Sequence, residues 1–268
     1  MCSRAPGLGC LAVHRREGCL GIRPRWRRLQ SIGRSMWATH VVRSMRGVIA
    51  NSRYTASMFG QGSGRFNPLV VYPQLTLPDD ATPDTEKVPE ARQQIAFIGR
   101  IEEEKGILEA LEILARLPAT YRLTVVGEGT AREVAEQRTR ELNLADRVTF
   151  LAWLGRDRLF QILNGTGVVI VPSLRGEGFG MVGVEALYSG TPVVAYEAGG
   201  VLEWCDGTFL RFVGPGDRAE AAAQIVALTS DPATWAEACR SAGEQARRRF
   251  DQPRQRALLL SALGLNDR

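Results

Sequence analysis

The sequence predicts a doubly wound α/β domain, in which helices cover both faces of a parallel sheet. Five apolar runs of four or five residues recur between residues 95 and 196, and each is continuous rather than alternating. Continuous apolar strands are buried on both faces, as they are in a parallel sheet between two layers of helices. Amphipathic stretches separate the runs and supply those helices.

The predicted elements follow one another at a regular spacing. The apolar runs, in order, are IAFIG (95–99), LTVVG (123–127), VTFL (148–151), VVIVP (168–172) and PVVAY (192–196). The amphipathic stretches predict helices at about 106–116, 130–142, 156–163, 181–189 and 217–230. Because parallel strands all end at one edge of the sheet, we expect ligands outside the carboxyl ends of these strands.

A short strand–helix–strand unit is predicted ahead of this domain. GVIA (47–50) and LVVY (69–72) are short apolar strands. Asn51 and Ser52 can cap a helix that runs through Phe59, with GQGSG (60–64) as a loop after it. Residues 73–92 then carry four prolines and five acidic residues, which is the composition of a linker.

The basic charge of the chain is concentrated at its front. The net charge is +5, but residues 1–78 alone carry +11, from twelve arginines against the single acid Glu17. Residues 1–35 have neither helical nor strand periodicity, so three interpretations stay open: a disordered basic tail, an organelle-targeting segment, or non-native sequence. Basicity alone does not predict nucleic-acid binding, and we expect no nucleic-acid partner. Contact with anionic lipid, at roughly 1 kcal/mol per base near the surface, is the alternative to a solvated tail.

Composition excludes several classes of protein. No apolar run approaches the roughly 18–20 residues that span a bilayer, and collagen, a disulfide scaffold and a wholly disordered chain do not fit the composition. The five cysteines form no C-x-x-C pair, and the only histidines are His14 and His40. We therefore expect free thiols in a reducing compartment and no metal site.

Two cations follow the first strand of the predicted domain. The loop GRIEEEKG (99–106) places Arg100 and Lys105 beside the start of a helix, whose unpaired amides favour an anion. Charge-assisted hydrogen bonds contribute about 1.5–3 kcal/mol each, which is enough to hold a diphosphate. The alternative is that Lys105 pairs with Glu102 or Glu103 on a solvated surface.

Glycine-rich loops follow two further strands. The tight turn Gly127–Gly129 follows the second strand and allows close backbone approach, although such turns are common. After the fourth strand, PSLRGEGFGMVGVEAL (172–187) runs into a helix start. Glu177 and Glu185, with seven residues between them, could reach different hydroxyls of one ligand. The alternative is one capping and one surface glutamate.

Six segments, in their order and spacing, resemble the donor-binding domain of retaining GT-B glycosyltransferases, family 4 type. They are GRIEEEKG, VVGEG, PSLRGEGFGMVGVEAL, GTPVVA, AGGVLE and GPGD. Glu177–Glu185 matches the E-x7-E signature of that family, and GRIEEEKG matches its G-R…K-G. The resemblance covers about residues 47–252 and implies a Rossmann-like GT-B C-terminal domain. ANSRYTASMF and VVYP look like the last strand–helix–strand of the family's N-terminal domain, and ARRRFD (246–251) resembles the approach to its terminal helix.

The resemblance also implies a reaction, the transfer of a hexose from a nucleoside-diphosphate sugar to a hydroxyl with retention at the anomeric carbon. Three catalytic residues are implied: Arg100 and Lys105 would clasp the departing diphosphate, and Glu177 would hold the donor sugar and the distal phosphate. Glu185 would bind the ribose hydroxyls. The other donor-binding residues implied are Gly99, Gly127, Leu154 (beside the nucleobase), Phe179, Gly180, Met181 and Val182. No metal and no other cofactor is expected.

The resemblance divides the chain into parts and leaves two functions open. The parts are 1–35, a basic tail; 36–78, a remnant of the N-terminal acceptor domain; 79–92, a linker; 93–250, the nucleotide-sugar-binding domain; and 251–268, a C-terminal helix. Because the first domain is reduced to its final unit, the alternative to a transferase is a donor-lobe remnant that binds nucleotide or is inert. The hydroxyl acceptor is unknown, a partner could supply the missing domain, and we expect a cytoplasmic location, at most peripheral at the inner membrane face.

Overall fold

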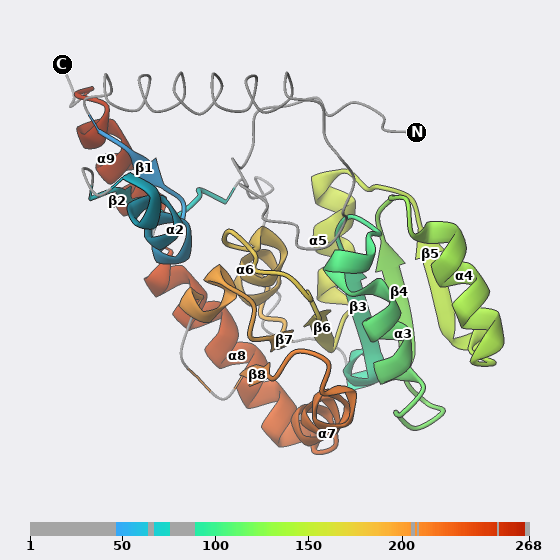
Figure 1. Ribbon diagram of the computed structural model, residues 1–268. Helices are drawn as coiled ribbons and strands as arrows, with labels where there is room; N and C mark the ends of the chain where they lie inside the picture. The colour runs from blue at the N-terminus through green and yellow to red at the C-terminus, as the bar shows by residue number, and fades with distance from the viewer. Residues whose placement is uncertain are drawn as a thin grey trace, which may run out of the picture. The chain divides into compact units, whose positions relative to one another are not determined.

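A six-stranded, all-parallel sheet lies at the centre of the protein (Figure 1). The computed structural model describes residues 47–63, 67–75, 89–204, 207, 209–250 and 252–265. The strands of the sheet are β3 (Gln94–Ile98), β4 (Arg122–Val126), β5 (Val148–Leu151), β6 (Val168–Val171), β7 (Val193–Tyr196) and β8 (Leu210–Val213). The doubly wound fold class and five of these strands are therefore confirmed, and β8 is an addition at the edge of the sheet.

The order of the strands places a crevice at the middle of the sheet. The order is β5-β4-β3-β6-β7-β8, so the first half of the domain extends to one side of β3 and the second half to the other side of β6. The two central strands pair in parallel, Ile95 with Val168 and Ala96 with Val169. The loops that follow β3 and β6 therefore leave the same edge in opposite directions. Ligands of doubly wound sheets bind at this switch point.

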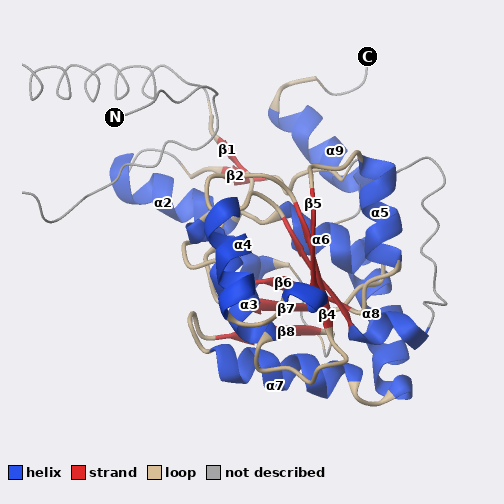
Figure 2. Ribbon diagram, turned by 90° about the vertical axis from the view of Figure 1, so that its right-hand side faces the viewer, coloured by secondary structure: helices blue, strands red, loops and turns tan. Residues whose placement is uncertain are grey.

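Helices cover both faces of the sheet. Figure 2 shows α3 (Ile107–Leu114) and α4 (Arg132–Glu141) on one side of the strands. On the other side lie α5 (Arg156–Asn164), α6 (Met181–Tyr188) and α8 (Pro232–Arg249). The remaining helix of this domain is α7 (Arg218–Thr229), and the short 3-10 turns are η1 (Pro89–Gln93), η2 (Glu103–Lys105), η3 (Ala145–Arg147) and η4 (Gly200–Glu203).

The core explains why these segments form strands and helices where they do. Every residue of β6 and β7 is buried, and all of β3 after Gln94 is buried as well. The helices contribute one apolar side each; in α3, for example, Leu111 and Leu114 are at most 1% exposed. Burial of this apolar surface, worth about 25 cal/mol per Å², is the main stabilising contribution to the domain.

A small parallel unit precedes the domain, as the sequence predicts. It consists of β1 (Ile49–Ala50), α2 (Arg53–Ser63) and β2 (Leu69–Val70), with β1 paired to β2. The Ser52 hydroxyl accepts a hydrogen bond from the backbone N–H of Thr55 at 2.9 Å, which confirms Ser52 as the cap of this helix. The predicted loop at 60–64 is wrong over residues 60–63, because α2 continues through them. Once a helix has begun, each further residue adds one backbone bond, and this outweighs glycine's low helix propensity there.

The last helix returns to this small unit. Figure 1 shows α9 (Gln252–Ala262) beside β1, β2 and α2. The side-chain oxygens of Gln252 and Gln255 accept hydrogen bonds from the backbone N–H groups of Leu75 and Tyr72, respectively. The described residues all belong to one compact unit, 47–268.

Several sequence-based expectations lie outside the described residues. These are the basic tail 1–35, residues 36–46, most of the linker 79–92, and both histidines, His14 and His40. Residues 89–92 of the predicted linker are described and belong to η1. In the described part of the chain, no helix is long and apolar enough to cross a bilayer.

Candidate functional site

A cavity of about 190 Å³ lies at the switch point between β3 and β6. Three segments line it: the end of β3 with the loop after it, the end of β6 with the loop after it, and the first turn of α6. The lining residues are Phe97, Ile98, Gly99, Arg100, Lys105, Ile170, Val171, Ser173, Glu177, Gly180, Met181 and Val182. The apolar strand-end residues are buried and form its floor, whereas Arg100 and Lys105 are more exposed and stand at its mouth.

Lys105 and Glu177 form an ion pair across this cavity. The Lys105 Nζ lies 2.6 Å from Oε1 and 2.8 Å from Oε2 of Glu177. The Ser173 hydroxyl donates a further hydrogen bond of 2.6 Å to Oε1. The two side chains are only 27% and 12% exposed. The predicted alternative, in which Lys105 pairs with Glu102 or Glu103 on the surface, is wrong, because the fold brings the loop after β6 over the loop after β3.

Close backbone packing holds these two loops together. Gly106, which follows Lys105, has a φ of 78°, and a Cβ there would lie 1.8 Å from the carbonyl oxygen of Pro172. Only glycine fits this contact and this conformation. Glu177 is held by its backbone: its N–H donates to the carbonyl of Ala198 at 2.9 Å, and its carbonyl accepts from the N–H of Gly200 at 2.8 Å.

The start of α6 presents backbone N–H groups to the cavity. Gly180 caps this helix with a φ of 79°, and Met181 and Val182 begin its first turn. Amides in a first helical turn have no earlier turn to bond, and the helix dipole adds a partial positive charge there. Together with Lys105, these amides make the mouth of the cavity suited to an anion such as a phosphate.

Arg100 stands at the edge of the same cavity with a more exposed side chain. Its Nη2 lies 3.5 Å from Oε1 of Glu104, and the Arg100 side chain is 61% exposed. An exposed pair of this kind is worth only about 0–1 kcal/mol. The guanidinium can therefore leave Glu104 for a more negative partner at small cost.

Glu185 lies on the second turn of α6 and does not line the cavity. Its carboxyl is partly buried and accepts no hydrogen bond from the described residues. Burial raises the pKa of Glu185, and the positive charge of Arg156, at the start of α5, opposes that rise. A partly buried carboxyl with spare acceptor capacity can take a hydrogen bond from a hydroxyl.

The three remaining predicted residues also lie outside the cavity. Gly127 supports its wall, since a Cβ there would lie 1.9 Å from the carbonyl oxygen of Gly99. Leu154 packs partly buried against the core. The Phe179 ring is buried and stacks on Tyr72 with ring centres 5.3 Å apart. Seven of the predicted residues thus meet in one cavity, namely Gly99, Arg100, Lys105, Glu177, Gly180, Met181 and Val182.

Comparison with known proteins assigns this arrangement to a family. The family model described as glycosyl transferases group 1 matches residues 79–249, more than half of the chain. The chain belongs to the group 1 glycosyltransferases.

The relatives that the chain matches include proteins named as glycosyltransferases. Over 143 residues the chain is 35% identical to the 2-deoxystreptamine glucosyltransferase of Streptomyces kanamyceticus, a match that covers 52% of this chain and 37% of that protein. Over 161 residues it is 35% identical to the D-inositol 3-phosphate glycosyltransferase of Mycolicibacterium vanbaalenii, covering 54% and 35%. The chain therefore spans little more than a third of the length of these relatives.

Solved structures of the GT-B type share the fold. The crystal structure of Anabaena Alr3699/HepE in complex with UDP superposes with a TM-score of 0.71 at 27% identity, covering 81% of this chain and 63% of that one. The same protein has also been crystallised with UDP-glucose. The sucrose-phosphate synthase of Thermosynechococcus elongatus, at 24% identity and a TM-score of 0.71, shows the same fold.

Sequence reasoning missed part of the site of this group 1 glycosyltransferase. Ser173, which donates to Glu177, was given no role, although it stands four residues ahead of Glu177 in a loop already singled out. The apolar floor formed by Phe97, Ile98, Ile170 and Val171 was assigned only to strands. A strand-end residue gives no local signal that its side chain faces a cavity rather than a helix.

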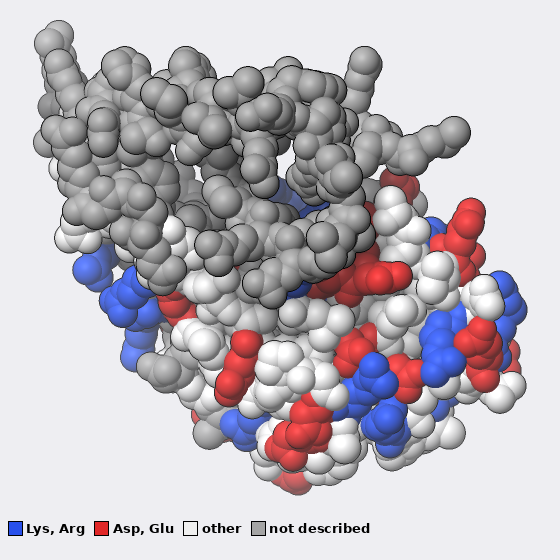
Figure 3. All heavy atoms as spheres, in the orientation of Figure 1, with Lys and Arg blue, Asp and Glu red and all other residues white. Residues whose placement is uncertain are grey.

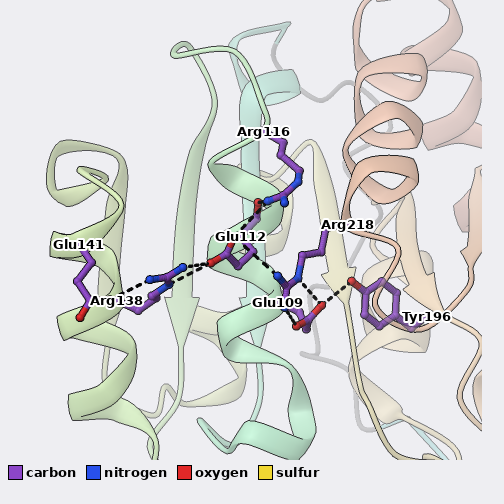
Figure 4. Close-up of polar contacts among 7 residues, drawn as sticks. All are labelled: Glu109, Glu112, Arg116, Arg138, Glu141, Tyr196 and Arg218. Carbon is purple, nitrogen blue, oxygen red and sulfur yellow. Dashed lines mark hydrogen bonds and ion pairs between the residues drawn. The ribbon is translucent and has the colours of Figure 1, made fainter.

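A second polar cluster, away from the cavity, was also missed. Figure 4 shows Glu109 of α3 between Arg218 of α7 and Tyr196 at the end of β7. The Arg218 Nε donates to Glu109 at 2.9 Å, and the Tyr196 hydroxyl donates to the same oxygen at 3.0 Å. Hydrogen bonding from Arg218 lowers the pKa of Glu109, whereas burial raises that of Tyr196 far above its ordinary value.

This cluster extends along the surface of α3. Glu112 of α3 is bonded to Arg138 of α4 and to Arg116, and Arg138 also reaches Glu141 at 2.9 Å. On the face drawn in Figure 3, acidic and basic side chains lie intermixed over the region of α3, α4 and α7. The cluster therefore ties α3, α4 and α7 together.

Proposed function

We propose that this chain binds a nucleoside-diphosphate sugar at the β3–β6 switch point and transfers its hexose to a hydroxyl, with retention at the anomeric carbon, as a family 4 type enzyme. The observation that carries the proposal is the pairing of Lys105 with Glu177 beside the first turn of α6, in a cavity at the switch point. Two of the relatives are named as a glucosyltransferase and a glycosyltransferase, and Alr3699/HepE has been crystallised with UDP-glucose; both findings support the proposal.

The cations at the cavity mouth suit the diphosphate of the donor. Lys105, Arg100 and the amides of Gly180 to Val182 would all direct positive charge to one place. As the sugar leaves, negative charge develops on the diphosphate, and preorganised donors stabilise that charge where it forms. Since these groups supply the positive charge, the proposed mechanism uses no metal and no other cofactor.

Glu177 would hold the sugar rather than attack it. Its two oxygens can accept about four hydrogen bonds, of which Lys105 and Ser173 supply three in this structure. When Lys105 turns to the diphosphate, acceptor positions on Glu177 become available for sugar hydroxyls. The leaving phosphate would then help to deprotonate the acceptor hydroxyl on the same face, so no covalent intermediate on Glu177 is proposed.

The nucleoside would lie beyond the cavity, along α6 and the loop after β5. Glu185 would accept from the ribose hydroxyls, which suits a partly buried carboxyl that accepts no hydrogen bond from the described residues. Leu154, in the loop after β5, would lie beside the nucleobase. Gly99 and Gly127 would keep the strand ends open to the diphosphate, and the backbone around Phe179 would carry the turn into α6.

Calorimetric titration of the chain with UDP, GDP and ADP tests the proposal. We expect one of them to bind, and we expect Lys105→Ala to weaken that binding about 10–100-fold through the loss of one charge-assisted contact. Arg100→Ala should also weaken it about 10–100-fold, toward the lower end of that range because the side chain is exposed. Arg240→Ala, which removes a similarly exposed charge on α8, serves as the control. If a folded chain binds none of the three nucleotides, the proposal is wrong.

Turnover separates transfer from binding alone. We expect the chain to release nucleoside diphosphate from a nucleotide sugar when a hydroxyl acceptor is present, and the anomeric proton coupling of the product reports retention. Binding without turnover would instead support a nucleotide-binding module that needs its acceptor side from another polypeptide.

A further inference from the structure

One aromatic ring of the small unit packs directly on the backbone beside Glu177. Tyr54, in the first turn of α2, packs on two glycines: a Cβ at Gly176 would lie 2.1 Å from the Tyr54 hydroxyl oxygen, and one at Gly199 would lie 2.8 Å from Tyr54 Cε1. Gly176 immediately precedes Glu177, and Gly199 pairs with Glu177 in a parallel bridge. The ring is therefore seated on both backbone segments that hold Glu177.

A carboxylate holds the backbone at the start of α2, which carries that ring. The two oxygens of Glu203 accept hydrogen bonds from the backbone N–H groups of Arg53 and Tyr54, both at 2.8 Å. The Tyr72 hydroxyl donates to the same carboxylate at 3.3 Å. A carboxylate at the start of a helix makes charge-assisted bonds and interacts favourably with the helix dipole. Because Glu203 ends η4, which begins directly after Gly199, one short segment joins the start of α2 to the partner of Glu177.

A third contact lies on the other side of Glu177. The Thr55 hydroxyl donates to the carbonyl of Gly178 at 3.3 Å. The first turn of α2 thus contacts residues 176, 178 and 199 around Glu177. In the described residues, by contrast, the contacts that hold Lys105 come from the loop after β3 and from Glu177 itself, not from the small unit.

We propose that Tyr54 and Glu203 are positioning residues, through which the small unit controls where Glu177 holds the donor sugar and distal phosphate. The inference rests on the proposed function, because it takes Glu177 as the group that holds the sugar. Neither residue lines the cavity, so both act through the backbone of the Glu177 loop. Displacement of α2 would loosen Glu177 and leave the nucleoside contacts at Glu185 in place.

The affinities for UMP and UDP-glucose, measured by calorimetry, test this separation of effects. If the wild type prefers guanosine or adenosine nucleotides, GMP with GDP-mannose or AMP with ADP-glucose replaces the pair. We expect Tyr54→Ala to weaken nucleotide-sugar binding about tenfold, the worth of one charge-assisted bond, and to change monophosphate binding less than twofold. Tyr54→Phe keeps the ring and should restore wild-type affinity. Met58→Ala, at an exposed position of the same helix, is the matched control.

Two further variants test the contact without removing the ring. Gly176→Ala places a Cβ against Tyr54, so it should weaken nucleotide-sugar binding in the wild-type background and add nothing when combined with Tyr54→Ala. Gly214→Ala, with nothing within 4 Å of the new Cβ, controls for the substitution itself. Glu203→Ala removes the acceptor for the backbone N–H groups of Arg53 and Tyr54. It should weaken nucleotide-sugar binding and leave monophosphate binding nearly unchanged, as Tyr54→Ala does. Thermal unfolding of each variant confirms that it is folded.

The outcomes separate this inference from the function on which it rests. A folded wild type that binds neither ligand overturns the proposed function, and the inference with it. A wild type that binds the nucleotide sugar, with Tyr54→Ala within twofold of it, overturns the inference alone. Equal losses of affinity for the monophosphate and for the nucleotide sugar in Tyr54→Ala also overturn the inference, because they would show a general structural role.

Discussion

Arg218 is expected to be a strong single determinant of stability. Glu109 is 5% exposed, and Arg218 gives it two hydrogen bonds, from Nε at 2.9 Å and from Nη2 at 2.5 Å. Arg218→Ala leaves the buried carboxylate with the Tyr196 hydroxyl as its remaining donor. Removing one partner of a buried pair costs about 3–5 kcal/mol, and because Arg218 is 37% exposed we expect the lower end, about 3 kcal/mol.

Urea unfolding of matched variants measures this loss. Arg116→Ala removes the same charge from an exposed pair with Glu112, where the expected loss is about 0.5 kcal/mol or less. The transition midpoint of Arg218→Ala should fall without a change in the denaturant slope, because the variant and the wild type expose nearly the same additional surface when they unfold. Equal losses in Arg218→Ala and Arg116→Ala at pH 7 would refute the reasoning.

The same pair predicts a dependence on pH. Hydrogen bonding from Arg218 lowers the pKa of Glu109 in the folded state. A group with a lowered folded pKa stabilises the fold above its ordinary pKa, and this stabilisation is lost as the pH falls through the folded pKa. The free-energy difference between the wild type and Arg218→Ala should therefore shrink from pH 7 toward pH 3. A difference that stays constant over that range would contradict the assignment of the effect to the carboxylate.

Three further predictions concern other described residues. Burial raises the pKa of Glu185, so nucleotide affinity should rise as the pH rises through that pKa. In Glu185→Gln, titrations at several pH values should show a weaker nucleotide affinity that changes less with pH. The raised pKa of Tyr196 keeps its phenol neutral in the folded state, so the free energy of unfolding should fall as the pH rises above about 10, the ordinary tyrosine value. Tyr196→Phe should remove this alkaline loss of stability in unfolding measurements. An unchanged loss would rule out the phenol as its source. Gly106→Ala combines a left-handed φ with a clash against Pro172, so thermal unfolding should show a loss of at least about 2 kcal/mol; Gly214→Ala, with open space around its Cβ, should unfold like the wild type.

Most of the sheet could be predicted from the sequence, and the exceptions have a physical cause. IAFIG and VVIVP become the two central strands β3 and β6, which are buried on both faces and therefore read as unbroken apolar runs. The strand β8 was missed because it pairs only with β7 at the sheet edge, and its central Arg211 and Phe212 are partly exposed. GQGSG predicts a loop because glycine is a poor helix former, but the preceding turns of α2 carry the helix through residues 60–63.

The candidate site was predictable as a set of residues but not as a set of contacts. Arg100, Lys105 and Glu177 stand after strands whose ends meet at one edge, so the topology alone brings them near each other. That Lys105 pairs with Glu177 rather than with Glu102 follows from the packing of Gly106 against Pro172, which joins two distant loops.

The sequence by itself determined the parallel sheet, the family and the residues at the strand ends, because apolar periodicity, glycines and charged side chains are local features of a chain. Only the tertiary structure decided which of these residues touch. Lys105 and Glu177 are 72 positions apart, and Arg53 and Glu203 are 150 apart. Such contacts depend on how closely two backbones approach across the fold, and the pattern of neighbours along the chain does not record that distance.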